Sequence, residues 1–135
     1  DFSGFVVDPC ARQEHMPIWL GGKTPRSLRR ALRFADGWDP FYLTVDELGV
    51  LLARARDWPE WRARDENGEK LSLVFSPDEV FDVAVPGQRE SMSALLRRYA
   101  AIGTDVLTLR FRSTSCDHLL EQLEIVAREV APEFA

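Results

Sequence analysis

One stretch, residues 17–38, constrains the fold more than any other part of the chain, because it combines a strand, a glycine turn and a capped helix. Its apolar run at 18–20 follows a proline and is typical of a strand buried on both faces. Gly21 and Gly22 allow a sharp turn and a close approach of the backbone to a ligand. Thr24 is a favourable N-cap, and the proline after it suits the first helical position. The stretch therefore predicts a βα unit whose helix begins directly after the glycines.

The start of this helix predicts an anion site. The first N–H groups of a helix have no partner within it and carry partial positive charge, so a phosphate or carboxylate held there is stabilised. The candidate binding residues are Gly21, Gly22, Lys23 and Thr24. The same pattern also fits an ordinary βα turn without a ligand, since glycine pairs are weak signals. The positive charge that follows fits either an anion-binding surface or a solvated helix face; it comprises Arg26, Arg29, Arg30 and Arg33.

Strands and helices alternate along the rest of the chain, which is typical of βαβ units with a mainly parallel sheet. The predicted strands are short apolar runs at 18–20, 38–43, 71–75 and 106–111. An extended piece at 80–85 leaves open whether one bent strand or two strands form there. Helices are predicted after Thr24, after the capping box of Thr44 and Glu47, at 89–102, and after the hydroxyl loop 113–115. Residues 57–61 are interpreted as a break, and 65–69 as a polar loop.

The composition restricts the class of protein further. With 135 residues and 45% hydrophobic residues, the chain is predicted to fold as a single domain over residues 1–135. A net charge of -5 argues against a general nucleic-acid binder. No apolar run approaches roughly 20 residues and no secretory signal is recognisable, so we expect no membrane partner. The residues Cys10, Cys116, His15 and His118 lie at no metal-ligand spacing, so we expect no metal and a reduced, cytoplasmic protein.

The sequence resembles the C-terminal half of the luciferase-like monooxygenases, a family of oxidoreductases that use FMN or the deazaflavin F420. The block PIWLGGKTPRSLRRALRFADGW at 17–38 carries most of the resemblance, and YAAIGTDVLTLRF at 99–111 and APEF at 131–134 add to it. The resemblance covers nearly the whole chain but is poor at 58–88. It implies an α/β fold with a mainly parallel sheet, in which about four βα units correspond to the fifth to eighth strands of a TIM (β/α)8 barrel.

The resemblance also implies where a cofactor and a substrate would bind. In such barrels the active site lies at the carboxyl ends of the strands. The turn from Gly21 and Gly22 to Lys23 and Thr24 would hold the phosphate of F420 or FMN, with a small organic substrate beside the cofactor ring. The side chains expected at the same rim, near the ring or an anionic group, are Trp38, Phe41, Arg110 and Arg112.

Each of these rim residues has a structural alternative. Trp38 and Phe41 also fit core packing, because aromatic residues at strand ends commonly fill barrel layers. In the last predicted strand, Leu107 and Leu109 point to one side and Arg110 to the other. A structural ion pair of Arg110 is therefore as compatible with the pattern as a ligand contact. Its candidate partners are Asp36, Asp39, Asp82 and Asp105.

Four βα units cannot close an eight-stranded barrel. Two sheet edges would stay unpaired, and several hundred Å² of apolar surface left in water would forfeit on the order of 10 kcal/mol. The inner-face side chains expected to be open to water include Ile18, Leu20, Phe41 and Leu73. We therefore expect either a homo-oligomer or a separate N-terminal half that completes the barrel. A non-catalytic cofactor-binding subunit and a purely structural half-barrel remain open as alternatives to the oxidoreductase.

Overall fold

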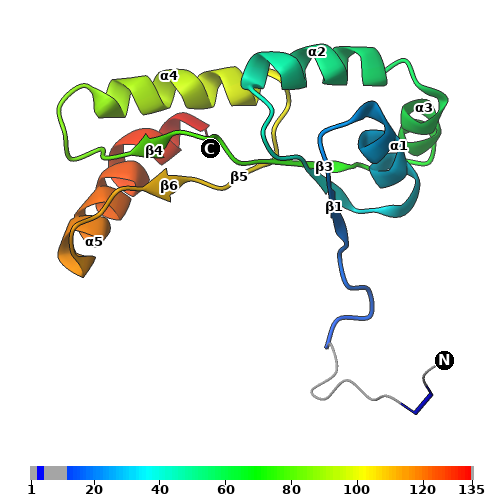
Figure 1. Ribbon diagram of the computed structural model, residues 1–135, viewed down its shortest axis with the longest axis horizontal. Coiled ribbons are helices and arrows are strands. Elements are labelled where there is room, and N and C mark those ends of the chain that lie inside the picture. Colours follow the sequence, from blue (N-terminus) through cyan, green and yellow to red (C-terminus); the bar gives the residue numbers. More distant parts are fainter. Residues whose placement is uncertain (1–2, 5–11, 135) are drawn as a thin grey trace.

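The computed structural model describes residues 3–4 and 12–134 and shows a mixed α/β fold with parallel strands (Figure 1). Four strands are neighbours in the order in which they occur in the sequence: β1 (Trp19–Gly21), β2 (Gly37–Asp39), β3 (Ser72–Phe75) and β5 (Val106–Leu107). All their pairings are parallel. A second parallel pair joins β4 (Val80–Phe81) to β6 (Arg110–Phe111). The predicted α/β class with a mainly parallel sheet is confirmed at this level.

The α-helices in the described part of the chain are α1 (Pro25–Phe34), α2 (Val45–Ala55), α3 (Pro59–Glu66), α4 (Gln88–Ala101) and α5 (Cys116–Ile125). Both predicted N-caps form capping boxes, Thr24 with Ser27 and Thr44 with Glu47. The helix after Thr44 does end before 57–61, as predicted, because α2 stops at Ala55, but a new helix that was not predicted begins within this stretch, with Pro59 at the first position of α3. The last helix continues into a π-helical turn, η1 (Val126–Val130), and a 3-10 turn, η2 (Ala131–Phe134).

The region 71–85 forms two strands rather than one bent strand. β3 ends at Phe75, and β4 begins only at Val80. On the neighbouring segment, Thr108 donates its backbone N–H to the Phe75 carbonyl at 2.9 Å, before β6 begins. Residues 76–79 therefore form a loop that divides the strand pairing into two parts. Likewise β2 ends at Asp39, sooner than predicted, because Pro40 follows it and has no N–H for a sheet.

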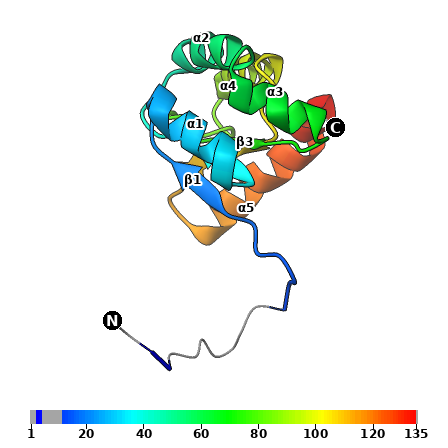
Figure 2. The ribbon, with the colours of Figure 1, turned by 90° about the vertical axis from the view of Figure 1, so that its right-hand side faces the viewer.

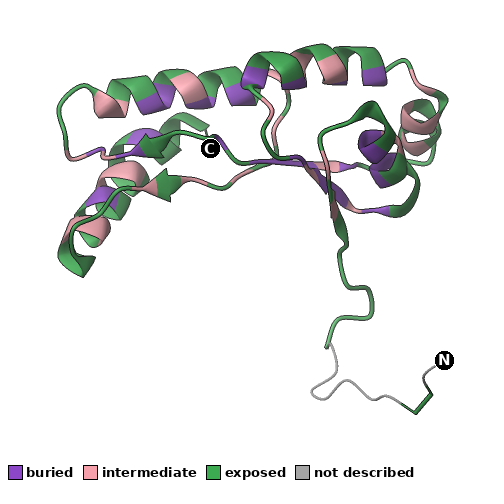
Figure 3. Ribbon diagram, in the orientation of Figure 1, coloured by how far each residue is buried: buried purple, intermediate pink, exposed green. Residues whose placement is uncertain are grey.

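Two apolar clusters join the helices to the strands, and the buried residues in Figure 3 lie mainly where α1, α2 and α4 face the sheet. The larger cluster contains Trp38, which is 0% exposed and packs edge-on against Phe75, with 6.1 Å between the ring centroids. Phe75 in turn lies 6.1 Å from Tyr99 of α4. The smaller cluster joins β4 to α4 and η1 and consists of Phe81, Val83, Met92, Leu96 and Val130. Figure 2 shows the helices α1 to α4 gathered over the strands.

The opposite face of the sheet is exposed at β1 and β5, although not through all the side chains that we expected. Leu73 is 3% exposed and Leu20 packs against the larger cluster, so both point to the helices and the expectation for them was wrong. Alternation along β1 instead places Trp19 on the opposite face, where its ring lies over Gly37 and is about half exposed. The two other side chains that we named are exposed as expected, namely Ile18 and Phe41.

Two aspartates, one directly before β2 and one directly before β5, bind the backbone of the neighbouring strand segment in the same way. Asp36 donates its backbone N–H to the Ile18 carbonyl at 2.8 Å, and its carboxylate accepts the Ile18 N–H at 2.7 Å. Asp105 repeats this pattern with Leu73, at 2.9 Å for both bonds. The carboxylates have one further side-chain partner each, His15 and Lys70 respectively. These contacts fix the register at which β2 and β5 enter the sheet.

Asp36→Asn is expected to destabilise the protein at neutral pH but not in acid. The hydrogen bond from the Ile18 N–H, together with His15, holds the pKa of the Asp36 carboxyl below its usual value. Because the folded-state pKa is depressed, the stabilisation is present above the unfolded value of about 4 and is lost as the pH falls through the folded value. Urea unfolding at about pH 7 and about pH 2.5 should therefore separate the variant from the wild type only at the higher pH.

The control for this comparison is Asp57→Asn, which removes a carboxylate whose side chain is 84% exposed. It should leave the midpoint of unfolding unchanged at both pH values, since exposed ion pairs contribute little. A loss at Asp36 that is equally large in acid would contradict the carboxylate as its cause.

Candidate functional site

The glycine turn between β1 and α1 is fixed by packing from two sides. Gly21 pairs in register with Asp39, and Gly22 adopts φ = +106°, a conformation that other residues rarely adopt. A Cβ at Gly22 would lie 2.8 Å from the Ser27 Cβ, so the first turn of α1 leaves no room for a side chain there. On the other side, the Trp38 indole N–H donates to the Gly22 carbonyl at 3.1 Å. The turn is therefore built rigidly at the carboxyl end of β1.

The start of α1 satisfies part of its own hydrogen-bonding capacity. The Thr24 hydroxyl accepts the Ser27 N–H at 3.2 Å, and the Ser27 hydroxyl oxygen accepts the Thr24 N–H at 3.1 Å. The Thr24 carbonyl accepts the Leu28 N–H as well. Within the part of the chain that the structure describes, this leaves the backbone N–H groups of Lys23 and Arg26 without a protein partner. The donors open to an anion are therefore these two groups and the Lys23 ammonium, while the Thr24 N–H is occupied.

Aromatic side chains lie next to the turn, on the segment that follows β2. Phe41 is about half exposed, and its ring edge would lie 3.9 Å from a Cβ at Gly21. Tyr42 packs edge-on against Phe41 at 5.4 Å, and its own φ of +55° is strained for a non-glycine residue. The Lys23 ammonium lies 6.0 Å from the centre of the Tyr42 ring. Phe41 thus lies beside the glycine turn.

Trp38 lies beneath this rim rather than in it. The whole side chain is buried in the larger apolar cluster, and its one polar atom is occupied by the Gly22 carbonyl. This position fits the core-packing alternative for Trp38. The residue acts on the turn through the hydrogen bond to Gly22, so it holds the candidate site without being open to a ligand.

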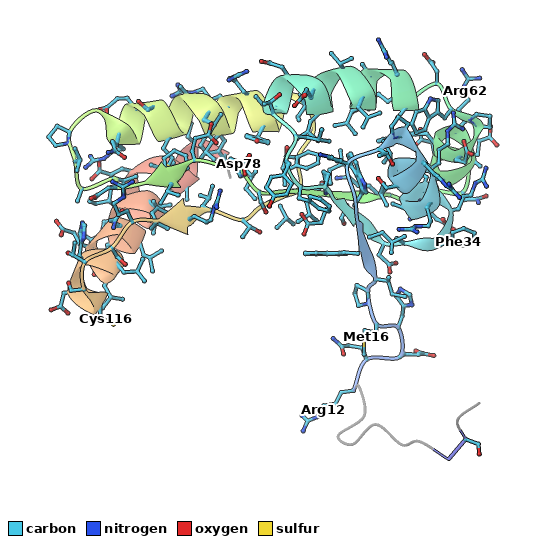
Figure 4. The ribbon with its side chains drawn as sticks, in the orientation of Figure 1. Arg12, Met16, Phe34, Arg62, Asp78 and Cys116 are labelled. Carbon is cyan, nitrogen blue, oxygen red and sulfur yellow. The ribbon has the colours of Figure 1, made fainter. Side chains whose placement is uncertain are left out.

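Arg110 and Arg112 do not lie at the glycine turn. Both belong to the segment of β6, which pairs with β4 and lies far to the left of β1 in Figure 1. The Arg110 guanidinium donates to the carbonyls of Pro77 at 3.1 Å and Asp78 at 2.6 Å, and the Asp78 carboxylate lies 3.6 Å away. Figure 4 shows Asp78 on that same side of the molecule. Arg110 therefore holds the loop 76–79, and its acidic partner is none of the four aspartates that the sequence suggested.

Two of the four arginines of α1 are engaged with α3. Glu60 accepts from Arg29 at 2.9 Å and from Arg33 at 2.5 Å, and its side chain is only 9% exposed. The Arg29 guanidinium also stacks over the Trp58 ring, 4.1 Å from its centre. Arg29 and Arg33 therefore serve helix packing, whereas Arg26 and Arg30 are exposed.

Sequence reasoning missed a second polar cluster, at the carboxyl ends of β4 and β6. His118 Nε2 lies 3.2 Å from the Asp82 carboxylate, and His118 Nδ1 accepts the Thr114 N–H at 3.3 Å. Gln122 is 0% exposed and ties the two strand ends together, accepting the Val83 N–H and donating to the Arg112 carbonyl. The sequence pattern around His118 in α5 gave no signal that Asp82 is its partner, because Asp82 follows β4 in a distant part of the chain. Both the oxygen and the nitrogen of the Gln122 amide group bind backbone atoms, which indicates a structural role.

Three further observations concern metal ligands, membrane-spanning helices and cysteines among the described residues. Within residues 3–4 and 12–134, no three or more acidic, histidine or cysteine side chains gather as metal ligands do. In the same part of the chain, no helix is both long enough and apolar enough to cross a bilayer. Cys116 is an exposed free thiol, whereas Cys10 lies outside the described residues.

Comparison with known proteins identified no family for this chain. No family model matches the chain, and no curated protein matches it either. The resemblance to luciferase-like monooxygenases therefore depends on the sequence blocks at 17–38 and 99–111. What the chain binds must be argued from the glycine turn and its surroundings.

Proposed function

We propose that this chain is an oxidoreductase module of the luciferase-like monooxygenase type, which binds F420 or FMN by its phosphate and acts on a small organic substrate. The observation that carries the proposal is the turn between β1 and α1, at the carboxyl end of a parallel strand, where the backbone N–H groups of Lys23 and Arg26 have no partner among the described residues and the Lys23 side chain is exposed. Ligands of parallel sheets bind outside the carboxyl ends of the strands. This placement supports a phosphate site at Gly21, Gly22, Lys23 and Thr24.

The donor set around the turn suits a phosphate group. Arg26 belongs to the first turn of α1 and Lys23 precedes its N-cap, so both unpaired N–H groups lie at the helix start, and the Lys23 ammonium adds a full positive charge. Phe41 and Tyr42 offer exposed aromatic surface beside it, against which a planar ring system can pack. F420 or FMN would supply the redox chemistry when bound, and the chain would supply binding and orientation.

The proposal includes a partner that completes the sheet. The sequential order of the four parallel strands supports a half-barrel arrangement, since barrel strands neighbour one another in sequence order. Trp19 and Val106 expose apolar surface on the two outer strands, β1 and β5. A second copy of the chain or a separate N-terminal half, in the cytoplasm, would cover this surface.

Lys23→Gln is expected to weaken cofactor binding roughly tenfold, because it removes one charge-assisted hydrogen bond to the phosphate. The dissociation constants for F420 and for FMN are measured by quenching of cofactor fluorescence. Lys70→Gln is the matched control, since Lys70 is 78% exposed and pairs with Asp105 on a different part of the sheet. It should bind the cofactor like the wild type.

The outcomes of this titration separate the parts of the proposal. Equal affinities of the Lys23 and Lys70 variants contradict the phosphate site at the turn, and no binding of either cofactor to the wild type contradicts the proposed function. Light scattering on the same samples tests the partner. A cofactor-loaded compact monomer would contradict self-association.

One observation favours the alternative of a non-catalytic or purely structural half-barrel. The reciprocal bonds of Thr24 and Ser27 make the corner partly self-sufficient, as in a βα turn that holds no ligand. Under the purely structural alternative, the wild type binds neither cofactor and Lys23→Gln changes nothing that can be measured. A non-catalytic cofactor-binding half-barrel would bind the cofactor, and lose affinity in Lys23→Gln, but give no turnover. The same titration followed by a turnover assay therefore decides between the two functions.

A further inference from the structure

Asp39 occupies the end of β2, directly beside the glycine turn. It pairs in register with Gly21, whose missing side chain leaves the adjacent position on the sheet unfilled. Trp38 points into the apolar cluster under the helices, so alternation along β2 directs Asp39 to the opposite face. Trp19 projects on that same face from β1, and Phe41 lies next to Gly21. The carboxyl group therefore faces the space beside the turn, among aromatic side chains.

The carboxyl group of Asp39 is partly buried but has no partner. Among the described residues it takes part in no hydrogen bond and no ion pair, and burial raises its pKa without a contribution from any charged neighbour. Other aspartates next to strands differ, since each has at least one partner at hydrogen-bond distance; they are Asp36, Asp82 and Asp105. A carboxyl that is desolvated without compensation costs free energy, and such groups are typical of functional sites.

We propose that Asp39 is the proton-transfer residue of this site, which contacts the substrate and exchanges a proton with it. The inference depends on the proposed oxidoreductase function and adds the substrate class. The exposed Phe41 ring beside Gly21 and the half-exposed Trp19 ring on the same face as Asp39 favour a small neutral molecule that packs against aromatic surface. We therefore expect conjugated carbonyl compounds, whose reduction needs a proton as well as a hydride.

For an α,β-unsaturated ketone, reduced F420 or FMN would supply a hydride and become oxidised. The hydride would form a C–H bond at the β-carbon, and the electron pair of the C=C bond would move towards the carbonyl. The O–H bond of Asp39 breaks, and its proton forms the new C–H bond at the α-carbon. Asp39 is left as a carboxylate, which takes a proton from water before the next turnover. The raised pKa keeps the acid form populated at higher pH than for an ordinary aspartate.

The test compares Asp39→Asn with the wild type, using reduced F420 and 2-cyclohexen-1-one as probes. The amide cannot donate this proton, so turnover should fall about 100-fold, as removal of a general acid typically does. The dissociation constant for F420 should stay within about twofold, because the turn itself is unchanged. Asp57→Asn, which removes an 84% exposed carboxylate, is the matched control and should keep wild-type turnover.

A second readout does not depend on turnover. In a carboxyl 13C NMR titration of the full chain, Asp39 should titrate above an ordinary aspartate and shift further when F420 is added. Wild-type turnover in the Asp39 variant, or a carboxyl titration that bound F420 leaves unchanged, overturns the inference while the proposed function stands. Failure of the wild type to bind F420 and FMN overturns the proposed function itself, and this inference with it.

Discussion

Trp38→Ala is expected to lower the free energy of unfolding by about 3–5 kcal/mol, which is the largest stability effect of any single substitution that we expect here. The side chain is 0% exposed, and its removal would leave a cavity in contact with Phe75. The Gly22 carbonyl would also lose its indole donor. Urea unfolding followed by circular dichroism measures the change, and a loss of this size is comparable with the whole stability of a small domain.

Two further variants separate the causes of this loss. Trp38→Phe keeps most of the buried apolar surface but removes the N–H, so it should cost less than the alanine and still loosen the glycine turn. Trp19→Ala is the control, because the ring of Trp19 is half exposed and should contribute about 1 kcal/mol or less. A cost for Trp38→Ala no greater than that of Trp19→Ala would contradict the burial of Trp38 as the centre of the core.

Local signals in the sequence predicted local structure well. Thr24 and Thr44 carry their caps within the next three residues, so the capping boxes depend on no distant contact. The helix α3 escaped prediction, because its apolar periodicity is weak and none of its residues is buried. It is held by residues about thirty positions earlier in the chain, through the ion pairs of Glu60 with Arg29 and Arg33 and the hydrogen bonds from Arg64 to carbonyls at the end of α1, and Trp61 packs against the larger cluster. A contact of that kind leaves no periodic trace in the sequence.

The difference between features set by adjacent residues and features set by distant contacts also explains which parts of the candidate site could be predicted. The turn at Gly21 and Gly22 could be predicted, because glycines, cap and proline are adjacent in sequence. The placement of Arg110 could not, since the loop 76–79 that it holds arises only because β3 and β4 are separate strands. In the barrel expectation all strand ends share one rim, whereas here β4 and β6 form their own pair. The arginines therefore lie away from the glycine turn.

The inner-face expectation failed at Leu20 and Leu73 for a related reason. Both residues are apolar, and the sequence alone does not say which face of a strand the helices cover. The structure sets this through Trp38, whose indole reaches from the core to the Gly22 carbonyl. Side chains that share its face are buried, and Asp39 is directed to the other face. The orientation of Trp38 thus shows that Asp39 lies on the face of β2 that the helices do not cover.

Gly22→Ala is expected to cost roughly 2–4 kcal/mol and to abolish anion binding at the turn. Two effects add here, since an alanine at φ = +106° is strained and its Cβ would lie 2.8 Å from the Ser27 Cβ. The matched control is Gly68→Ala, at φ = +70°, where a Cβ would meet nothing within 4 Å. It isolates the conformational cost and should lose only about 1 kcal/mol. The difference between the two variants in urea unfolding measures how tightly the first turn of α1 packs against the glycines, so equal losses would show that the turn is open rather than rigid.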